Sequence, residues 1–140
     1  MAWLGKPDPV DPAVLDEGYV DRLAKHVGVI VACELLADGM IELSDRLDRL
    51  AHLAADGRIE EIGSLAHDIA GISGHLGLTA LSARAVTATR ACRSEEWPEA
   101  ETVVAPMLDL REASIAALVA FCKSRNPAAA DAQSDEIPRS

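Results

Sequence analysis

The residue with the clearest chemical potential in this chain is His67, because it stands among residues that have almost no side chain. The segment LAHDIAGISGHLGL, residues 65–78, follows a helical pattern and yet contains three glycines, Gly71, Gly74 and Gly77. A glycine inside a helix costs about 0.5–1 kcal/mol relative to alanine, so several of them together indicate that a bare surface is needed. Imidazole is a nucleophile near neutral pH. An uncrowded ring suits chemistry in which another protein must approach it closely.

A helical wheel separates His67 from the residues that face the protein interior. With about 3.6 residues per turn, one apolar stripe runs along residues 58–76 and His67 lies roughly opposite to it. The stripe consists of Ile59, Ile62, Ala66, Ile69, Ser73 and Leu76. The small residues around His67, with Gly63 beside them, form the predicted partner-docking surface: Ser64, Ala70, Gly71 and Gly74. We expect Leu65 or Ile72 at its edges.

The pattern around His67 resembles the histidine phosphotransfer (HPt) family. Members carry a histidine on an exposed helix face, typically followed by lysine at the third position and glycine at the fourth, and often by another glycine at the tenth. His67, Gly71 and Gly77 occupy the matching positions, whereas Ala70 stands where lysine is usual. The resemblance implies that His67 is the phosphoacceptor. It also implies that the site transfers more slowly or holds a more labile phosphoryl group, unless Arg58, Arg84 or Arg90 offsets its charge.

The resemblance also implies a role in a two-component phosphorelay. The phosphoryl group would pass between receiver-domain aspartates, and the partners would be response-regulator receiver domains and a hybrid histidine kinase. Mg²⁺ is expected only in the receiver, so we expect no intrinsic cofactor, no metal site and no autonomous kinase activity. The family further suggests a monomer.

Three alternatives remain open. Ala70 favours a non-transferring adaptor or inhibitor that binds a receiver or a histidine kinase. Asp68 follows His67 as an acid often does in sensor kinases, which allows a phosphoacceptor domain that has lost its catalytic half, although the usual proline is missing. A plain helical bundle that mediates oligomerisation is the third, and it leaves the glycines around His67 unexplained.

Composition limits the class of protein and its partners. The chain has 140 residues, of which 49% are hydrophobic and only 3% aromatic, which favours a single domain of helices packed through aliphatic stripes. A formal net charge of −10 argues against nucleic acids and anionic membranes. No apolar run approaches the roughly 20 residues of a membrane span, and the N-terminus lacks the apolar core of a signal peptide. We therefore expect a cytoplasmic location.

The fold predicted from these patterns is all-α: an antiparallel four-helix bundle with an additional N-terminal helix packed across one end. Residues 1–11 are predicted to be a flexible arm, residues 12–125 the bundle domain and residues 126–140 a disordered tail. The expected helices span residues 12–26, 29–55, 58–76, 79–94 and 98–123. Asp11 is the expected N-cap of the first helix. Thr79 or Leu78 is expected to open the fourth, where Thr79 can serve as a cap, and Pro106 should kink or interrupt the last helix.

The cysteines and the second nearby histidine carry weaker signals. Cys33, Cys92 and Cys122 lie far apart without a CxxC spacing, so we expect buried free thiols rather than a disulfide or a zinc site. His75 lies eight residues after His67, which does not match the i, i+4 spacing of a paired metal site. Trp97 is expected to anchor the turn into the last helix.

Overall fold

The computed structural model describes residues 12–94 and 98–125, and throughout these two ranges the regular secondary structure is helical. Six helices follow one another: α1 (Glu17–Val27), α2 (Val29–Asp56), α3 (Ile59–His75), α4 (Thr79–Cys92), α5 (Ala100–Leu108) and α6 (Arg111–Arg125). The predicted all-helical class is confirmed. The predicted arm 1–11, the predicted tail 126–140 and Trp97 lie outside the described residues.

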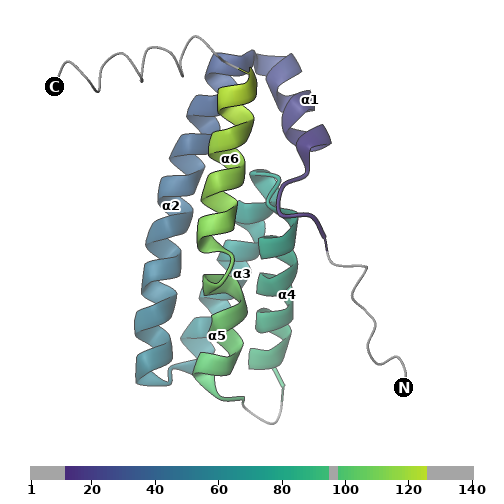
Figure 1. Ribbon diagram of the computed structural model, residues 1–140. Coiled ribbons are helices and arrows are strands. Elements are labelled where there is room, and N and C mark those ends of the chain that lie inside the picture. The colour runs from purple at the N-terminus through teal and green to yellow at the C-terminus, as the bar shows by residue number, and fades with distance from the viewer. Residues whose placement is uncertain (1–11, 95–97, 126–140) are drawn as a thin grey trace, which may run out of the picture.

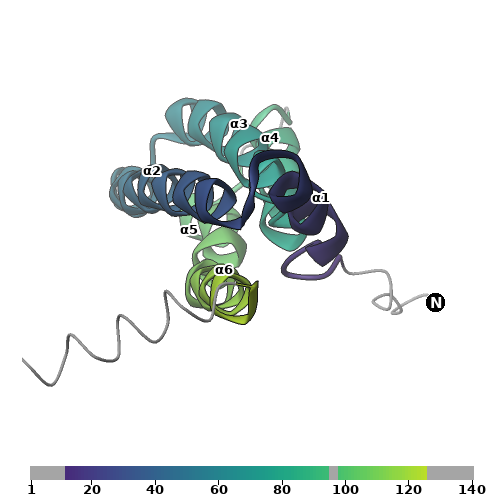
Figure 2. The same cartoon turned by 90° about the horizontal axis from the view of Figure 1, so that it is seen from above.

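Figure 1 shows α2, α3, α4 and the successive pair α5 and α6 lying lengthwise beside one another, with α1 beside the end at which α2 begins. The view from above shows the long helices around a shared interior (Figure 2). The turn after α2 begins at Gly57, which ends the helix in the left-handed conformation with φ of 69°, where glycine is favoured. The pair α3 and α4 makes the most extensive contact between any two helices, and this contact positions the surface that carries His67.

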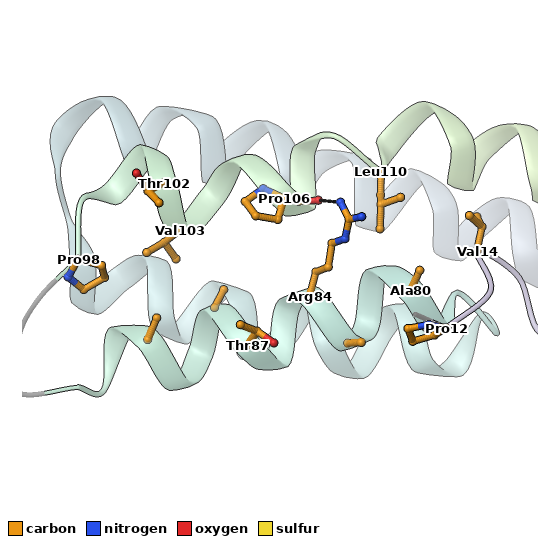
Figure 3. Close-up of a pocket in the computed structure, with 13 residues that line it drawn as sticks. Pro12, Val14, Ala80, Arg84, Thr87, Pro98, Thr102, Val103, Pro106 and Leu110 are labelled. Carbon is orange, nitrogen blue, oxygen red and sulfur yellow. Dashed lines mark hydrogen bonds between the residues drawn. The ribbon is translucent and has the colours of Figure 1, made fainter. Parts of the chain in front are cut away.

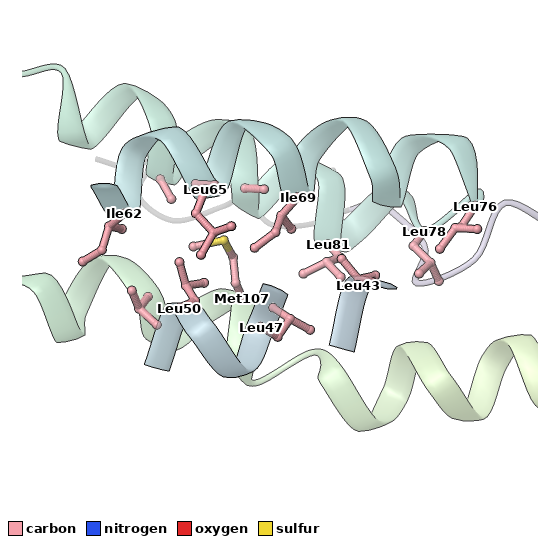
Figure 4. Close-up of a cluster of buried hydrophobic side chains, with 14 of the residues drawn as sticks. Leu43, Leu47, Leu50, Ile62, Leu65, Ile69, Leu76, Leu78, Leu81 and Met107 are labelled. Atoms are coloured by element: carbon pink, nitrogen blue, oxygen red, sulfur yellow. The ribbon is translucent and has the colours of Figure 1, made fainter. Parts of the chain in front are cut away.

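The interior is aliphatic and is built on the stripe of α2. The side chains of Leu36, Leu43, Leu47 and Leu50 are at most 1% exposed. Several of them pack against leucines and isoleucines of α3 and α4 and against Met107 of α5 (Figure 4). The opposite face of α2 carries four exposed acidic residues, Glu34, Asp38, Asp45 and Asp48. This amphipathic pattern is what makes the long helix form and orient itself.

Helix α1 begins later than predicted. The sequence suggests a start at Pro12 after an Asp11 cap, whereas α1 begins at Glu17 and Asp11 lies outside the described residues. The actual cap is Asp16, whose carboxylate accepts a hydrogen bond from the backbone N–H of Tyr19 at 3.1 Å. Both aspartates are good caps by residue type, so the choice between them depends on where the preceding segment packs.

That preceding segment is fastened to the turn between α3 and α4. The backbone N–H of Asp16 donates to the carbonyl of Gly77 at 2.8 Å. The carbonyl of Ala13 accepts from the hydroxyl of Thr79 at 2.6 Å and from the N–H of Ala80 at 3.0 Å. Thr79 therefore does not cap α4, because its hydroxyl serves this long-range contact instead.

The predicted interruption near Pro106 separates α5 from α6. Beyond the proline, the N–H of Leu110 donates to the carbonyl of Met107 at 3.2 Å, where a continuing α-helix would use the carbonyl of Pro106. The carbonyl of Pro106 instead accepts a hydrogen bond from the guanidinium of Arg84 at 2.8 Å. Because the last helix breaks here, Arg84 of α4 is engaged in a structural contact with the freed carbonyl.

The expectation of three free thiols is wrong for two of the cysteines. Cys33 near the start of α2 and Cys122 near the end of α6 form a disulfide, with their Cα atoms 5.9 Å apart. They are 89 residues apart in the sequence, and they meet because α6 runs back along α2. Cys92 is free and buried.

Ion pairs add further links from α6 to the helices beside it. The guanidinium of Arg125 lies 2.9 Å from the carboxylate of Asp21 on α1, and this hydrogen bond lowers the pKa of Asp21. Arg111 lies 2.7 Å from the carboxylate of Asp48 on α2 and likewise lowers the pKa of Asp48. These carboxylates are exposed to solvent, so each pair adds little to stability.

Candidate functional site

His67 lies in the middle of α3 on its solvent-exposed face. On the opposite face Ile62, Ile69 and Ser73 are 0% exposed. The entire predicted inward stripe is buried, so the orientation predicted for α3 is correct. The apolar stripe therefore holds the helix in place while the imidazole stands in solvent.

The hydrogen bonds of the four histidines, all of which lie in the described ranges, set His67 apart. Nδ1 of His26, His52 and His75 each bonds to the backbone carbonyl four residues earlier, at 2.8–2.9 Å. Within residues 12–94 and 98–125, no group forms a hydrogen bond or an ion pair with the His67 ring. Both of its nitrogens are thus available to a partner.

The glycines near His67 are present for different structural reasons. A Cβ on Gly71 would meet nothing within 4 Å, and a Cβ on Gly74 would lie 3.7 Å from the hydroxyl of Ser82. A Cβ on Gly63 would come within 2.9 Å of the Cβ of Cys92. Gly63 therefore permits the close approach of α4 to α3, whereas Gly71 and Gly74 leave an exposed surface without steric crowding.

The other residues predicted for the docking surface differ in exposure. Ser64 is exposed, while Ala70 is half-buried and its carbonyl accepts a hydrogen bond from the hydroxyl of Ser82 at 2.9 Å. Of the two residues expected as alternatives at the edge of the surface, Leu65 is buried at 8% exposure. Ile72 is half-buried and remains at the edge.

A groove of about 570 Å³ runs along the exposed face of α3 and reaches the end of α4. We call it the His67 groove, and its lining residues are Glu60, Gly63, Ser64, His67, Asp68, Cys92 and Arg93. Burial raises the pKa of the Cys92 thiol, which keeps it protonated and a poor nucleophile. The imidazole of His67 is therefore the nucleophile that this groove offers.

Arg93 is the residue of this groove that the sequence reasoning missed. It follows α4 directly and acts as its C-terminal cap residue. No spacing in the sequence links it to His67, because the two positions meet only through the packing of α4 on α3 at Gly63.

The three arginines proposed from the sequence as charge partners lie elsewhere. Arg58 pairs with Glu61 at 2.7 Å. Arg84 lines a second groove of about 500 Å³ between α4 and α5, where it reaches the carbonyl of Pro106 (Figure 3). Arg90 is exposed but is not part of the lining of the His67 groove.

Neither a cluster of metal ligands nor a membrane-spanning helix is found among the residues that the structure describes. In the described part of the chain, no three or more histidine, cysteine, aspartate or glutamate side chains gather as metal ligands would. His75 bonds to the carbonyl of Gly71 rather than facing His67 across a shared site. None of the helices in residues 12–94 and 98–125 combines the length and the apolar character that crossing a membrane requires.

Comparison with protein families agrees with the geometry of α3. The family model of the Hpt domain matches residues 34–121, which is more than half of the chain and includes the whole of α3. Neither the curated proteins nor the solved structures include a significant match. Domains of this family take part in histidine phosphotransfer within phosphorelays and interact with receiver domains and histidine kinases. The chain belongs to the Hpt domain family.

Proposed function

We propose that this protein relays a phosphoryl group between receiver-domain aspartates, with His67 as the phosphoacceptor. The observation that carries the proposal is the contrast among the histidines: no group of the described residues bonds to either ring nitrogen of His67, whereas each of the other three bonds to a backbone carbonyl. Gly71, one turn further along α3, leaves open space beside the ring. An exposed, unpaired imidazole next to open space is what a docking receiver needs.

The reaction needs little from this chain beyond access and position. A ring nitrogen of His67 attacks the phosphorus of a receiver's aspartyl phosphate, the N–P bond forms, and the P–O bond to the carboxylate breaks. The attacking nitrogen is the one that carries no proton in the neutral ring, and once the N–P bond has formed the proton on the other ring nitrogen can pass to solvent. Transfer to a second receiver reverses these steps. The receiver supplies Mg²⁺ and a lysine to the phosphoryl oxygens, because such transfers depend on in-line positioning and charge compensation.

The proposed docking surface surrounds His67 and comprises Ser64, Ala70, Gly71 and Gly74. Its partners are receiver domains and a hybrid histidine kinase, and the protein acts as a monomer in the cytoplasm. The supporting architecture is an antiparallel four-helix bundle of α2, α3, α4 and α5–α6, with α1 packed across one end.

Incubation with a phosphorylated receiver tests the relay. We expect the wild-type protein to take up phosphate that is acid-labile and stable to base, as a phosphohistidine is. His67→Gln should take up none, and the matched control His75→Gln should be labelled like the wild type. Labelling of His67→Gln at the wild-type level would contradict the assignment.

A second candidate function is a non-transferring adaptor or inhibitor of a receiver or kinase. The observation that favours it is Ala70, which leaves the usual lysine position without a cation. The same experiment separates the two functions. A stable complex with a receiver, but no label on His67, supports the adaptor and rejects the relay.

A further inference from the structure

The His67 groove contains one cation on a surface that is otherwise unfavourable for phosphate. Its charged lining residues are Glu60, Asp68 and Arg93. Two carboxylates repel a phosphoryl group, and so does the negative end of the α4 dipole, at which Arg93 lies. The lysine that family members typically place three residues after the histidine is replaced by Ala70. A phosphoryl group on His67 therefore needs a cation from another element.

Arg93 is available for this role. Within the two described ranges its guanidinium has no hydrogen bond or ion pair, and the residue is exposed. The other cations considered for this role are engaged or lie elsewhere: Arg58 pairs with Glu61, and Arg84 bonds to Pro106. Arg93 alone among the arginines of the described residues lines the His67 groove.

The packing of α4 on α3 brings Arg93 to this position. Gly63, one turn before His67, has only a hydrogen where a Cβ would come within 2.9 Å of the Cβ of Cys92. Cys92 is the last residue of α4 and Arg93 follows it. Because glycine has no side chain, the end of α4 can pack closely against α3 at Gly63, next to the face that carries His67.

We propose that Arg93 binds the phosphoryl oxygens of phospho-His67 and replaces the missing lysine from a different helix. This inference rests on the proposed role of His67. Arginine suits the task because its planar guanidinium donates two parallel hydrogen bonds to phosphate oxygens. The contact stabilises phospho-His67 against hydrolysis, because its charge-assisted hydrogen bonds lower the free energy of the phosphorylated protein and are lost when the phosphoryl group leaves the imidazole.

The test uses phosphoramidate, a small phosphoryl donor that needs no partner protein. The imidazole nitrogen attacks its phosphorus, the N–P bond to His67 forms, and ammonia leaves. In hydrolysis water attacks the phosphorus, the N–P bond breaks, and inorganic phosphate leaves. The lifetime of each phosphohistidine is followed by mass spectrometry in the full chain. We expect Arg93→Gln to shorten the lifetime of phospho-His67 about two- to fivefold, as suits an exposed charge pair.

Matched variants separate a phosphate contact from a structural effect. Arg90→Gln removes an exposed arginine of α4 outside the groove and should leave the lifetime unchanged. Arg93→Lys should retain part of the lifetime of phospho-His67, and Ala70→Lys added to Arg93→Gln should restore that lifetime. The lifetime of any phosphate on His75 should not change when Arg93 is replaced, because His75 is not part of the lining of the groove.

Three results overturn the inference: a phospho-His67 lifetime in Arg93→Gln that equals or exceeds that of the wild type, a shortened lifetime that Ala70→Lys does not reverse, and a failure of phosphoramidate to label His67. A shortened lifetime that Ala70→Lys reverses supports it. If that effect is seen but no phosphorylated receiver labels the wild type, the inference about Arg93 stands and the relay proposed above fails.

Discussion

The two faces of α3, a helix of 17 residues, differ in role: one stabilises the fold and the other presents His67 to solvent. On the inner face Ile62 and Ile69 are completely buried among the side chains of α2, α4 and α5 (Figure 4). On the outer face His67 has no partner within the described residues, and Gly71 faces open space. The buried side chains that stabilise the fold and the exposed imidazole that a partner must reach are therefore kept on opposite faces by the 3.6-residue period of the helix. A change on one face should leave the property of the other intact.

The largest effect is expected from Ile69→Ala on the inner face. Truncating a fully buried isoleucine removes apolar contacts and leaves a cavity, which costs about 2–5 kcal/mol of unfolding free energy. Denaturant unfolding followed by circular dichroism measures the loss. Below the unfolding transition the variant should still accept phosphate on His67. A loss below about 0.5 kcal/mol, the range of surface substitutions, would show that the inner face is not the source of stability.

Gly63→Ala should have an intermediate effect on stability, because Gly63 is the residue of α3 that packs against Cys92 at the end of α4. Its new Cβ would lie 2.9 Å from the Cβ of Cys92, so the end of α4 must shift. Overpacking costs about 1–3 kcal/mol, and replacing a helical glycine returns about 1 kcal/mol. We expect a net loss of up to about 2 kcal/mol in denaturant unfolding, together with a phospho-His67 lifetime as short as that of Arg93→Gln. An unchanged lifetime would show that the position of Arg93 does not depend on Gly63.

The helices that could be predicted from the sequence are those whose signals are local. The stripe of α2, the glycine that ends it and the inward positions of α3 all follow from periodicity and residue type. The start of α1 could not be predicted, because the choice of Asp16 as the cap depends on hydrogen bonds from its segment to the turn after α3. The disulfide between Cys33 and Cys122 was missed for a similar reason, since only the return of α6 along α2 brings the cysteines together.

The candidate site shows the same limit on a smaller scale. The exposure of His67 and the open space at Gly71 follow from the wheel of one helix. Arg93 lies on another element, and its distance from His67 in the sequence contains no hint of a shared groove. Gly63 was a partial signal: a glycine at the side of the stripe indicates either docking or close helix packing, and the contact with Cys92 identifies packing. A site residue that lies on a second helix can thus be identified only when the packing of the two helices is known, and local sequence patterns do not give that packing.

The smallest effect in stability, and the sharpest test of the comparison, is expected from Gly71→Ala on the outer face. The new Cβ meets nothing within 4 Å, and the φ of Gly71 is not positive, so alanine should stabilise the protein by about 0.5–1 kcal/mol. The same methyl group stands beside His67 on the surface proposed for docking. Labelling by phosphoramidate should therefore be unchanged, while labelling by a phosphorylated receiver should slow, because only the larger donor needs clearance. Gly18→Ala, which adds the same methyl group at an exposed glycine of α1 outside the proposed docking surface, is the matched control for both measurements. If Gly71→Ala accepts phosphate from the receiver at the wild-type rate, the glycine does not serve docking. If it instead destabilises the protein, the outer face of α3 is not free, and the separation of duties between the two faces fails.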